Sequence, residues 1–362
     1  MFVASRDIRF AKGRFALMGA VVTLITTLVV FLNGLTGGLA RAASSAIDGL
    51  PVDGIVFGAP AGASPEVSFS NSTIDAAQAA AWAKAPGVAS AEPLGVAMTR
   101  FTGDGAAASV SLLGASAALL PPLVSGTAPR DGQAVVSEEL AEEYGLAAGA
   151  KVRLGTRRIT VSGVGEDRSY AHAPSVWTGL HTWERVTGQE QPTALALDRD
   201  GEGGGDTGGG PGGDTARDTR AVPLGDAPAG IDGYSAEQGS LQLIQVFLFA
   251  VSALVTGAFF TVWTVQRKPD IAVLKAIGAS SGYLVRDALA QALAVLLSGG
   301  LLGAALGALG GALASASVPF ALGAASVAAP VLAMVLLGLA GSALAVRRIT
   351  SVDPLTALGA TR

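Results

Sequence analysis

Side chains that could catalyse a reaction or hold a metal are sparse in this sequence. There is no cysteine, which excludes thiolate nucleophiles, cysteine-held zinc and disulfide bonds. The two histidines, His172 and His181, have no partners spaced as in a catalytic triad, a paired-carboxylate site or a metal cluster. The phosphate-binding sequence GxxxxGK(S/T) is also absent. We therefore predict that the chain is not an enzyme, holds no metal or intrinsic cofactor, and depends on another polypeptide for energy.

One polar stretch, residues 266–283, has the residue pattern of a short amphipathic helix. Its sequence QRKPDIAVLKAIGASSGY places Pro269 and Asp270 where a helix would begin and Gly278 where it would end. The apolar residues between them fall on one face: Ile271, Leu274 and Ile277. The pattern predicts a short amphipathic helix that a soluble partner could push. A helix that merely lies on the membrane surface would have the same pattern.

Glycines form a regular stripe near the end of the chain. Gly299, Gly303, Gly307 and Gly311 recur every four residues, so they share one side of a helix. Small residues at this spacing let membrane helices approach closely. We predict that the stripe packs against a neighbouring helix, within the subunit or across a homodimer. With 49 glycines in the chain, chance spacing is the alternative.

Four long apolar blocks must position these residues. A mean hydropathy of +0.50 with 14% charged residues is too apolar for an ordinary soluble protein. Each block is long enough at 1.5 Å per residue to cross a bilayer core of roughly 30 Å. The predicted transmembrane helices are residues 15–39, 241–265, 284–313 and 324–346. A cleaved signal peptide would also begin with a basic, apolar segment, but its apolar core is usually about 7 to 15 residues.

Charge placement predicts the orientation. Lys and Arg gather before the first block, between the second and third, and after the fourth: Arg6, Arg9, Lys12, Arg14, Arg267, Lys268, Lys275, Arg286, Arg347 and Arg348. Because basic loops stay in the cytoplasm, both termini are predicted to be cytoplasmic in a multi-pass plasma-membrane protein. Residues 1–14 are predicted to form an interfacial helix on the lipid bilayer, with a disordered basic anchor as the alternative. Residues 347–362 are predicted to be a cytoplasmic tail.

The region at 40–240 reads as a separate, water-soluble domain. Residues 42–240 hold 12 Lys and Arg against 24 Asp and Glu, a net −12, whereas the rest of the chain holds 12 against 4, a net +8. Its patterns predict helices at 72–85 and 135–144, strands within 88–113 and a hairpin at 151–164. The Gly-rich stretch 200–218 is predicted to be a disordered loop. The predicted fold class is therefore an α-helical membrane protein with four transmembrane helices and an α+β extracytoplasmic domain between the first and second.

Several of these motifs resemble one family. RKPDIAVLKAIGAS resembles the segment between the second and third membrane helices of ABC-transporter permeases of the macrolide-exporter and FtsX superfamily, type VII. RRITSVDPLTALG, at residues 347–359, is similar to the C-terminal signature of that family, and the topology also matches. MFVASRDIRFAKGRFALMG and GEDRSYAHAPSVW, at 165–177, most resemble its DevC/HrtB branch, whose best-known members export haem.

The resemblance implies a mechanism. It implies a homodimer working with two copies of a separate ATPase that hydrolyses ATP, and export by mechanotransmission of haem or another hydrophobic compound. Residues 266–283 would be the coupling helix that docks on the ATPase. The implied coupling residues are Asp270, Ile271, Leu274, Lys275, Ile277 and Gly278.

Substrate contacts are the least defined part of the sequence. If the cargo is haem, Asn33 and Asp48 are the candidate contacts near the external end of the first helix, although Asp48 also suits a solvated helix end. Met18 is too deep. Tyr170 and His172 are more familiar iron ligands, but they lie in a motif that looks structural.

Two further hypotheses remain open. The first is an FtsX-like signal transmitter that activates an extracytoplasmic cell-wall hydrolase, and the second is a membrane-anchored adhesion or sensor protein without an ATPase. No nucleic-acid partner is predicted.

Overall fold

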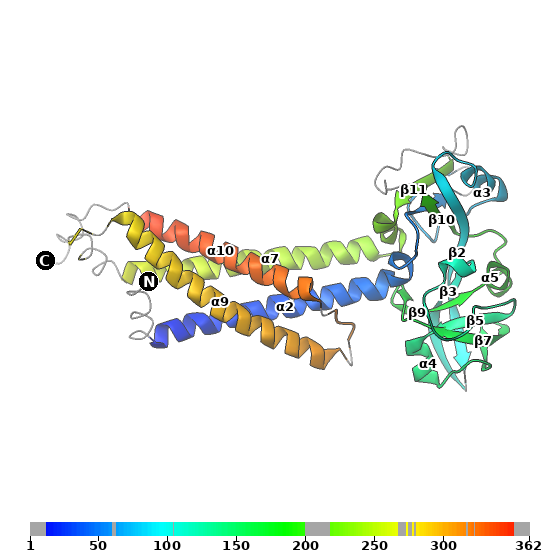
Figure 1. Cartoon of the computed structure of the whole chain (residues 1–362), viewed down its shortest axis with the longest axis horizontal. Coiled ribbons are helices and arrows are strands. Elements are labelled where there is room, and N and C mark those ends of the chain that lie inside the picture. The colour runs from blue at the N-terminus through cyan, green and yellow to red at the C-terminus, as the bar shows by residue number, and fades with distance from the viewer. Residues whose placement is uncertain are drawn as a thin grey trace. The chain divides into compact units, whose positions relative to one another are not determined.

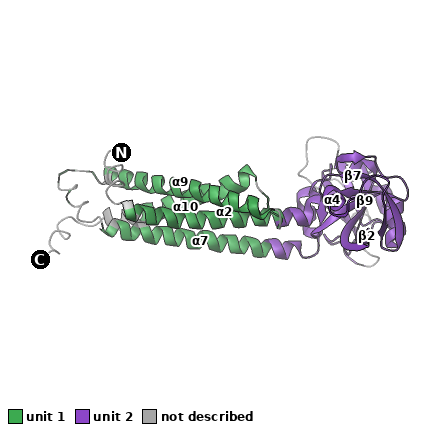
Figure 2. Ribbon diagram, turned by 90° about the horizontal axis from the view of Figure 1, so that it is seen from below, with its two compact units in different colours: residues 1–38, 239–362 green, residues 39–238 purple. Residues whose placement is uncertain are grey.

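The computed structural model divides the chain into two compact units (Figures 1 and 2). One unit comprises residues 1–38 and 239–362, and the other comprises residues 39–238. The residues that the structure describes are 12–59, 63–103, 105–199, 218–266, 273, 277–278, 280–315, 318–321 and 323–350. The predicted interfacial helix at 1–14, the tail at 347–362 and the Gly-rich loop at 200–218 lie largely outside them.

Four long helices account for most of the first unit. They are α2 (Lys12–Asp48), α7 (Tyr234–Gln266), α9 (Ser281–Ala314) and α10 (Ala324–Thr350). Each contains a stretch long and apolar enough to cross a membrane. Leu24, Leu254 and Leu313 are each more than 70% exposed on these helices. Leucines that point outward are expected where lipid rather than water surrounds the protein.

All four helices extend beyond the predicted apolar blocks, α2 and α7 by the most residues. The helix α2 continues nine residues past Leu39, through ARAASSAID, and ends just before Gly49. Alanine is a strong helix former, and Gly49 with Pro51 marks the end. The helix α7 likewise begins at Tyr234, before the predicted start at 241. The last ten residues of α2 therefore belong to the second unit.

The second unit is a mixed α/β domain. Its sheet has the strand order β11-β1-β10-β2-β3-β9-β5-β7-β4, with β6 and β8 paired alongside. The strands are β1 (Gly54–Gly58), β2 (Val88–Gly103), β3 (Ala106–Gly114), β4 (Leu123–Gly126), β5 (Gln133–Ser137), β6 (Lys151–Leu154), β7 (Arg157–Gly165), β8 (Ser169–Tyr170), β9 (Ala173–Thr178), β10 (Ala194–Arg199) and β11 (Thr219–Pro223). The short helices are α3 (Ala76–Trp82), α4 (Glu138–Tyr144) and α5 (Leu180–Thr187), with 3-10 turns η1 (Ala117–Leu119) and η2 (Leu224–Gly230). The predicted fold class is confirmed.

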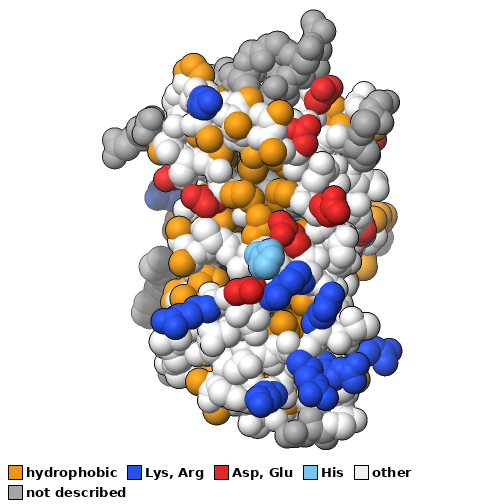
Figure 3. Space-filling model, turned by 90° about the vertical axis from the view of Figure 1, so that its right-hand side faces the viewer, with side chains coloured by type: hydrophobic (Ala, Val, Ile, Leu, Met, Phe, Trp, Pro, Cys, Tyr) orange, Lys and Arg blue, Asp and Glu red, His pale blue; other side chains and the backbone are white. Residues whose placement is uncertain are grey.

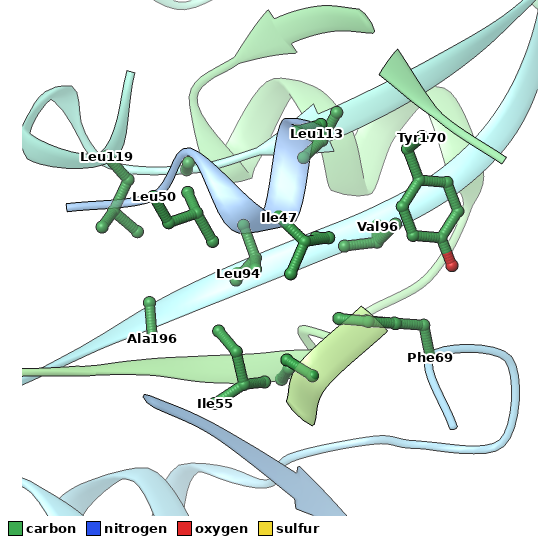
Figure 4. Close-up of a cluster of buried hydrophobic side chains, with 14 of the residues drawn as sticks. Ile47, Leu50, Ile55, Phe69, Leu94, Val96, Leu113, Leu119, Tyr170 and Ala196 are labelled. Atoms are coloured by element: carbon green, nitrogen blue, oxygen red, sulfur yellow. The ribbon is translucent and has the colours of Figure 1, made fainter. Parts of the chain in front are cut away.

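The strand β2 joins two hydrophobic cores. Its first half pairs with β10 and its second half with β3. One core gathers Leu94, Leu113 and Trp177 around Ile47 and Leu50, at and just beyond the end of α2 (Figure 4). The other lies under α4 and α5 and includes Phe101, Leu140 and Trp183. The end of α2 is thus built into the core of the domain.

Local capping explains where the short helices begin. The helix predicted at 135–144 starts only at Glu138, because Val135 and Val136 are buried strand residues and the Ser137 side chain accepts a hydrogen bond from the Leu140 N–H. The prediction was therefore wrong for 135–137. The helix predicted at 72–85 is shorter, starting after Asp75, which forms a capping box with Gln78. The hairpin at 151–164 is confirmed by the β6–β7 pairing.

Candidate functional site

A polar network joins three of the long helices within the first unit. The Asn33 side chain on α2 donates from Nδ2 to the backbone oxygen of Ser326 on α10, at 2.7 Å. Gln245 on α7 donates from Nε2 to Asn33 Oδ1 and to Thr36 Oγ1, both at 3.3 Å. Amides surrounded by apolar side chains need such partners, because lipid offers none. Asn33 therefore sits where α2, α7 and α10 meet.

Sequence reasoning found Asn33 but missed its partners. Part of the signal was present, because Gln242 and Gln245 are the two amides in the largely apolar block 241–265, but the sequence does not show which of them meets Asn33. Ser326 takes part through its backbone carbonyl, which no sequence pattern identifies. Whether this carbonyl can accept the hydrogen bond from Asn33 depends on where α10 begins.

The connection between α9 and α10 packs onto α2 beside this network. The Ala321 N–H donates to the Gly34 carbonyl at 2.9 Å. The Phe320 ring lies against Gly34 and Gly311, and its centroid is 5.3 Å from that of Phe31. A Cβ at Gly38 would overlap the Pro319 carbonyl. Glycines on α2 are therefore what permits the close approach of this connection.

The glycine stripe of α9 faces α2 within the same chain. A Cβ at Gly303 would lie 2.6 Å from the Thr23 carbonyl oxygen, and one at Gly299 would lie 2.9 Å from Val22 Cγ1. Gly307 is similarly close to α2, and Gly311 meets Phe320. Thr27 Oγ1 also donates to the Gly303 carbonyl at 3.2 Å. The importance of the stripe for assembly and transport stays a prediction.

Asp48 occupies the last turn of α2. Its Oδ2 accepts a hydrogen bond from Ser44 Oγ at 2.5 Å, and the side chain is exposed. Fifteen residues of continuous helix separate it from Asn33, so the two candidate substrate residues do not share a site. Asp48 has the surroundings of a solvated helix-end charge.

Tyr170 and His172 have different surroundings in the structure. Tyr170 is 6% exposed and belongs to the core in Figure 4, where burial, and then the Asp232 carboxylate, raise the pKa of its hydroxyl. His172 Nε2 pairs with Glu237 Oε2 at 3.0 Å. No cluster of three or more metal-ligating side chains occurs among the described residues. The Tyr170 ring therefore belongs to the core, and His172 is held by Glu237.

Only the end of the predicted coupling helix lies in the described part of the chain. Asp270, Ile271, Leu274 and Lys275 fall outside it. The Ile277 N–H donates to the Val273 carbonyl at 3.1 Å, a helical i to i−4 bond. Ile277 is 76% exposed, Gly278 follows with φ of +98°, and Ser280 caps α9. An exposed isoleucine thus ends one helical turn immediately before the next helix begins.

Comparisons with known proteins cover both units. Residues 15–201 match the family model described as MacB-like periplasmic core domain, and residues 243–354 match FtsX-like permease C-terminal. A Staphylococcus haemolyticus protein with the provisional name hemin transport system permease protein HrtB is 24% identical over 366 residues, covering 99% of each chain. An uncharacterized ABC transporter permease of Mycobacterium bovis is 27% identical over 312 residues, covering 81% of each.

One solved structure has a weak similarity to part of this chain. The crystal structure of the periplasmic region of MacB from Actinobacillus actinomycetemcomitans is 12% identical, with a TM-score of 0.36, and covers 51% of this chain and 95% of that one.

Proposed function

Because this chain belongs to the FtsX- and MacB-like family of ABC transporter permeases, we propose that it expels haem or another hydrophobic compound from the membrane by mechanotransmission. Permeases of this family lack an ATPase domain, so the chain implies a partner ATPase subunit. It is a multi-pass membrane protein with four candidate spans. The observation that carries the proposal is the match of both family models, at 15–201 and 243–354.

The choice of haem as cargo has two supports. The first is the match over 99% of both chains to a relative named for hemin transport. The second is the network of Asn33 and Gln245, whose amide N–H groups are donors for carboxylates within a largely apolar helix bundle. Haem combines an apolar macrocycle with two carboxylates. A cargo of this type would displace the bonds between α2, α7 and α10 as it enters.

The driving motion is proposed to enter through residues 266–283. In a homodimer with two ATPase copies, nucleotide-driven closure of the ATPases would move this segment and with it α7 and α9. The exposed Ile277 supports this role, because an apolar side chain in a segment rich in basic residues needs a partner or the lipid surface to cover it. The proposal places both termini in the cytoplasm.

The haem tolerance of cells that express the chain tests whether haem is the exported compound. Expression of the chain with its ATPase in a haem-sensitive bacterium should raise the tolerated haem concentration severalfold. The same pair with an ATPase that binds but does not hydrolyse ATP should give no protection. Unchanged tolerance together with an ATP-dependent rise in cell-wall hydrolase activity would instead favour an FtsX-like signal transmitter.

Charge substitution tests the coupling segment. Leu274→Asp or Ile277→Asp should abolish copurification of the ATPase, because a carboxylate would have to be desolvated in an apolar contact. Ala272→Asp is the matched control, since residue 272 falls on the opposite side of the predicted helix and adds the same charge. Retained ATPase binding in both test variants would refute the docking role.

A further inference from the structure

A pocket of about 700 Å³ opens in the domain of residues 39–238, and nothing in the proposed export mechanism uses it. Its size lies within the range of small-molecule sites, roughly 300 to 1,000 Å³. It is formed by residues 69–73, by the middle of β2, by the turn after β8, by the loop 189–193 and by Asp232. These five segments are far apart in sequence, so the pocket depends on the folded domain.

The lining combines an apolar wall with negative charge. Phe69, Val96 and Met98 supply apolar surface, and Met98 is 47% exposed. Glu190 and Asp232 supply carboxylates, and no Lys, Arg or His occurs among the described residues that line the pocket. Figure 3 shows one face of the molecule on which most acidic side chains lie in the upper half and most basic side chains lie in the lower half. An anion such as haem is therefore a poor fit to this pocket.

The hydroxyl of a largely buried tyrosine, Tyr170, lies at the pocket. Tyr170 is 6% exposed and lines the pocket, and its hydroxyl makes no hydrogen bond to another side chain or backbone group among the described residues. Its ring packs edge-to-face on Phe69, with centroids 5.6 Å apart, and its oxygen points out of the hydrophobic cluster in Figure 4. Burial and the nearby Asp232 raise the pKa of this hydroxyl, so it remains a neutral phenol. A neutral phenol oxygen accepts a hydrogen bond from a cationic N–H group.

The wall that carries Tyr170 is held in a strained conformation. Ala171 and His172 have φ of +49° and +61°, which costs a non-glycine residue about 1–2 kcal/mol. The Ala171 N–H donates to the Ala43 carbonyl at 2.8 Å, and the His172 N–H donates to the Ala42 carbonyl at 3.1 Å. Strained backbone persists where the surroundings over-determine it, often at ligand sites. The pocket is therefore preformed rather than assembled around its ligand.

We propose that this pocket binds an organic cation with an apolar body. An ammonium or guanidinium group would pair with the carboxylates of Asp232 and Glu190 and donate to the Tyr170 oxygen. The apolar body would lie against Phe69, Val96 and Met98. This ligand class differs in charge from haem, so the site is additional to the proposed export path.

Fluorescence binding with the full chain in lipid nanodiscs tests the proposal. Dansylcadaverine, a fluorescent primary amine, is the probe, and empty nanodiscs supply the lipid background. The cation should bind about tenfold or more tightly than its neutral N-acetyl derivative or the anionic dansyl-aminocaproate. Equal binding of the three compounds, or no saturable binding of the cation at millimolar concentration, would overturn the proposal.

Matched variants locate the binding. The double change Asp232→Asn with Glu190→Gln should weaken cation binding about tenfold or more. The control, Glu142→Gln with Glu143→Gln, removes the same charge from exposed residues on α4 and should leave binding unchanged. Tyr170→Phe keeps the ring in the core and should weaken binding severalfold without unfolding the domain. Equal losses in the test and control pairs would contradict the site. Because neither ATP nor haem is present, the result is independent of the proposed export function.

Discussion

The lack of a Cβ atom at particular glycines lets α9 approach α2 closely. Gly303 lies against the Thr23 carbonyl and the Thr26 side chain, whereas Gly300, three residues earlier, has Val331 Cγ1 at an ordinary 3.5 Å from its would-be Cβ. Both glycines lie on α9 among apolar residues. Only at Gly303 would an added Cβ come too close to atoms of a neighbouring helix. Glycine count alone does not distinguish them, because the sequence shows a four-residue spacing but not which helix it faces.

Alanine substitution separates the two positions. Gly303→Ala should destabilise the permease by about 1–3 kcal/mol, because the added methyl overpacks a backbone contact. Gly300→Ala should be neutral or slightly stabilising, since its methyl meets only ordinary van der Waals contact. Thermal unfolding of the purified chain in one detergent measures both. Similar midpoints for the two variants would mean that α9 and α2 separate easily at this contact.

The amide network gives a second prediction at the same scale. Gln245→Leu should destabilise the bundle by about 0.6–2 kcal/mol, because Asn33 Oδ1 and Thr36 Oγ1 lose their donor where lipid cannot replace it. Gln242→Leu on the same helix is the control, since residue 242 is exposed. A double-mutant cycle between Asn33→Ala and Gln245→Ala should show coupling in thermal stability. Strictly additive effects of the two substitutions on thermal stability would argue against the hydrogen bond between Gln245 and Asn33.

At the scale of elements, the turn between β8 and β9 fixes the end of α2. Besides the two backbone bonds to Ala42 and Ala43, the Ser169 N–H donates to Ser45 Oγ at 2.8 Å. The motif GEDRSYAHAPSVW was recognised in the sequence only as a family signature. Its role follows from positive φ angles and backbone donors, neither of which can be deduced from an alanine and a histidine.

Glycine substitution tests whether this turn is strained. Ala171→Gly should leave stability unchanged or raise it by up to about 1 kcal/mol, because glycine adopts positive φ without the Cβ penalty. Ala173→Gly is the control: Ala173 is a buried strand residue two positions later, and this change should lower stability by about 1 kcal/mol. Thermal unfolding again provides the readout. A larger loss at residue 171 than at residue 173 would show that the turn relaxes in solution.

At the scale of the whole molecule, the layout was predictable and the strand order was not. The apolar blocks at 15–39 and 241–265 identify membrane helices because bilayer thickness sets a length that few other structures require. Strand order depends on contacts between distant residues, such as Gly54 with Leu197 and Ser111 with Ser175, for which local alternation gives no information. The 135–137 segment shows the same limit, since buried valines suit either a strand or a helix.

Membrane orientation is the prediction on which the mechanism depends most. The Lys and Arg residues that flank the apolar blocks predict cytoplasmic loops there, and the domain at 42–240 is then predicted to lie outside. Since the chain has no cysteine, Lys275→Cys and Glu142→Cys each introduce a single labelling site. A membrane-impermeant maleimide should label Glu142→Cys on intact cells and reach Lys275→Cys only after lysis. Labelling of Lys275→Cys from outside would put the segment 266–283 beyond the reach of a cytoplasmic ATPase, and ATP-driven export through it would be ruled out.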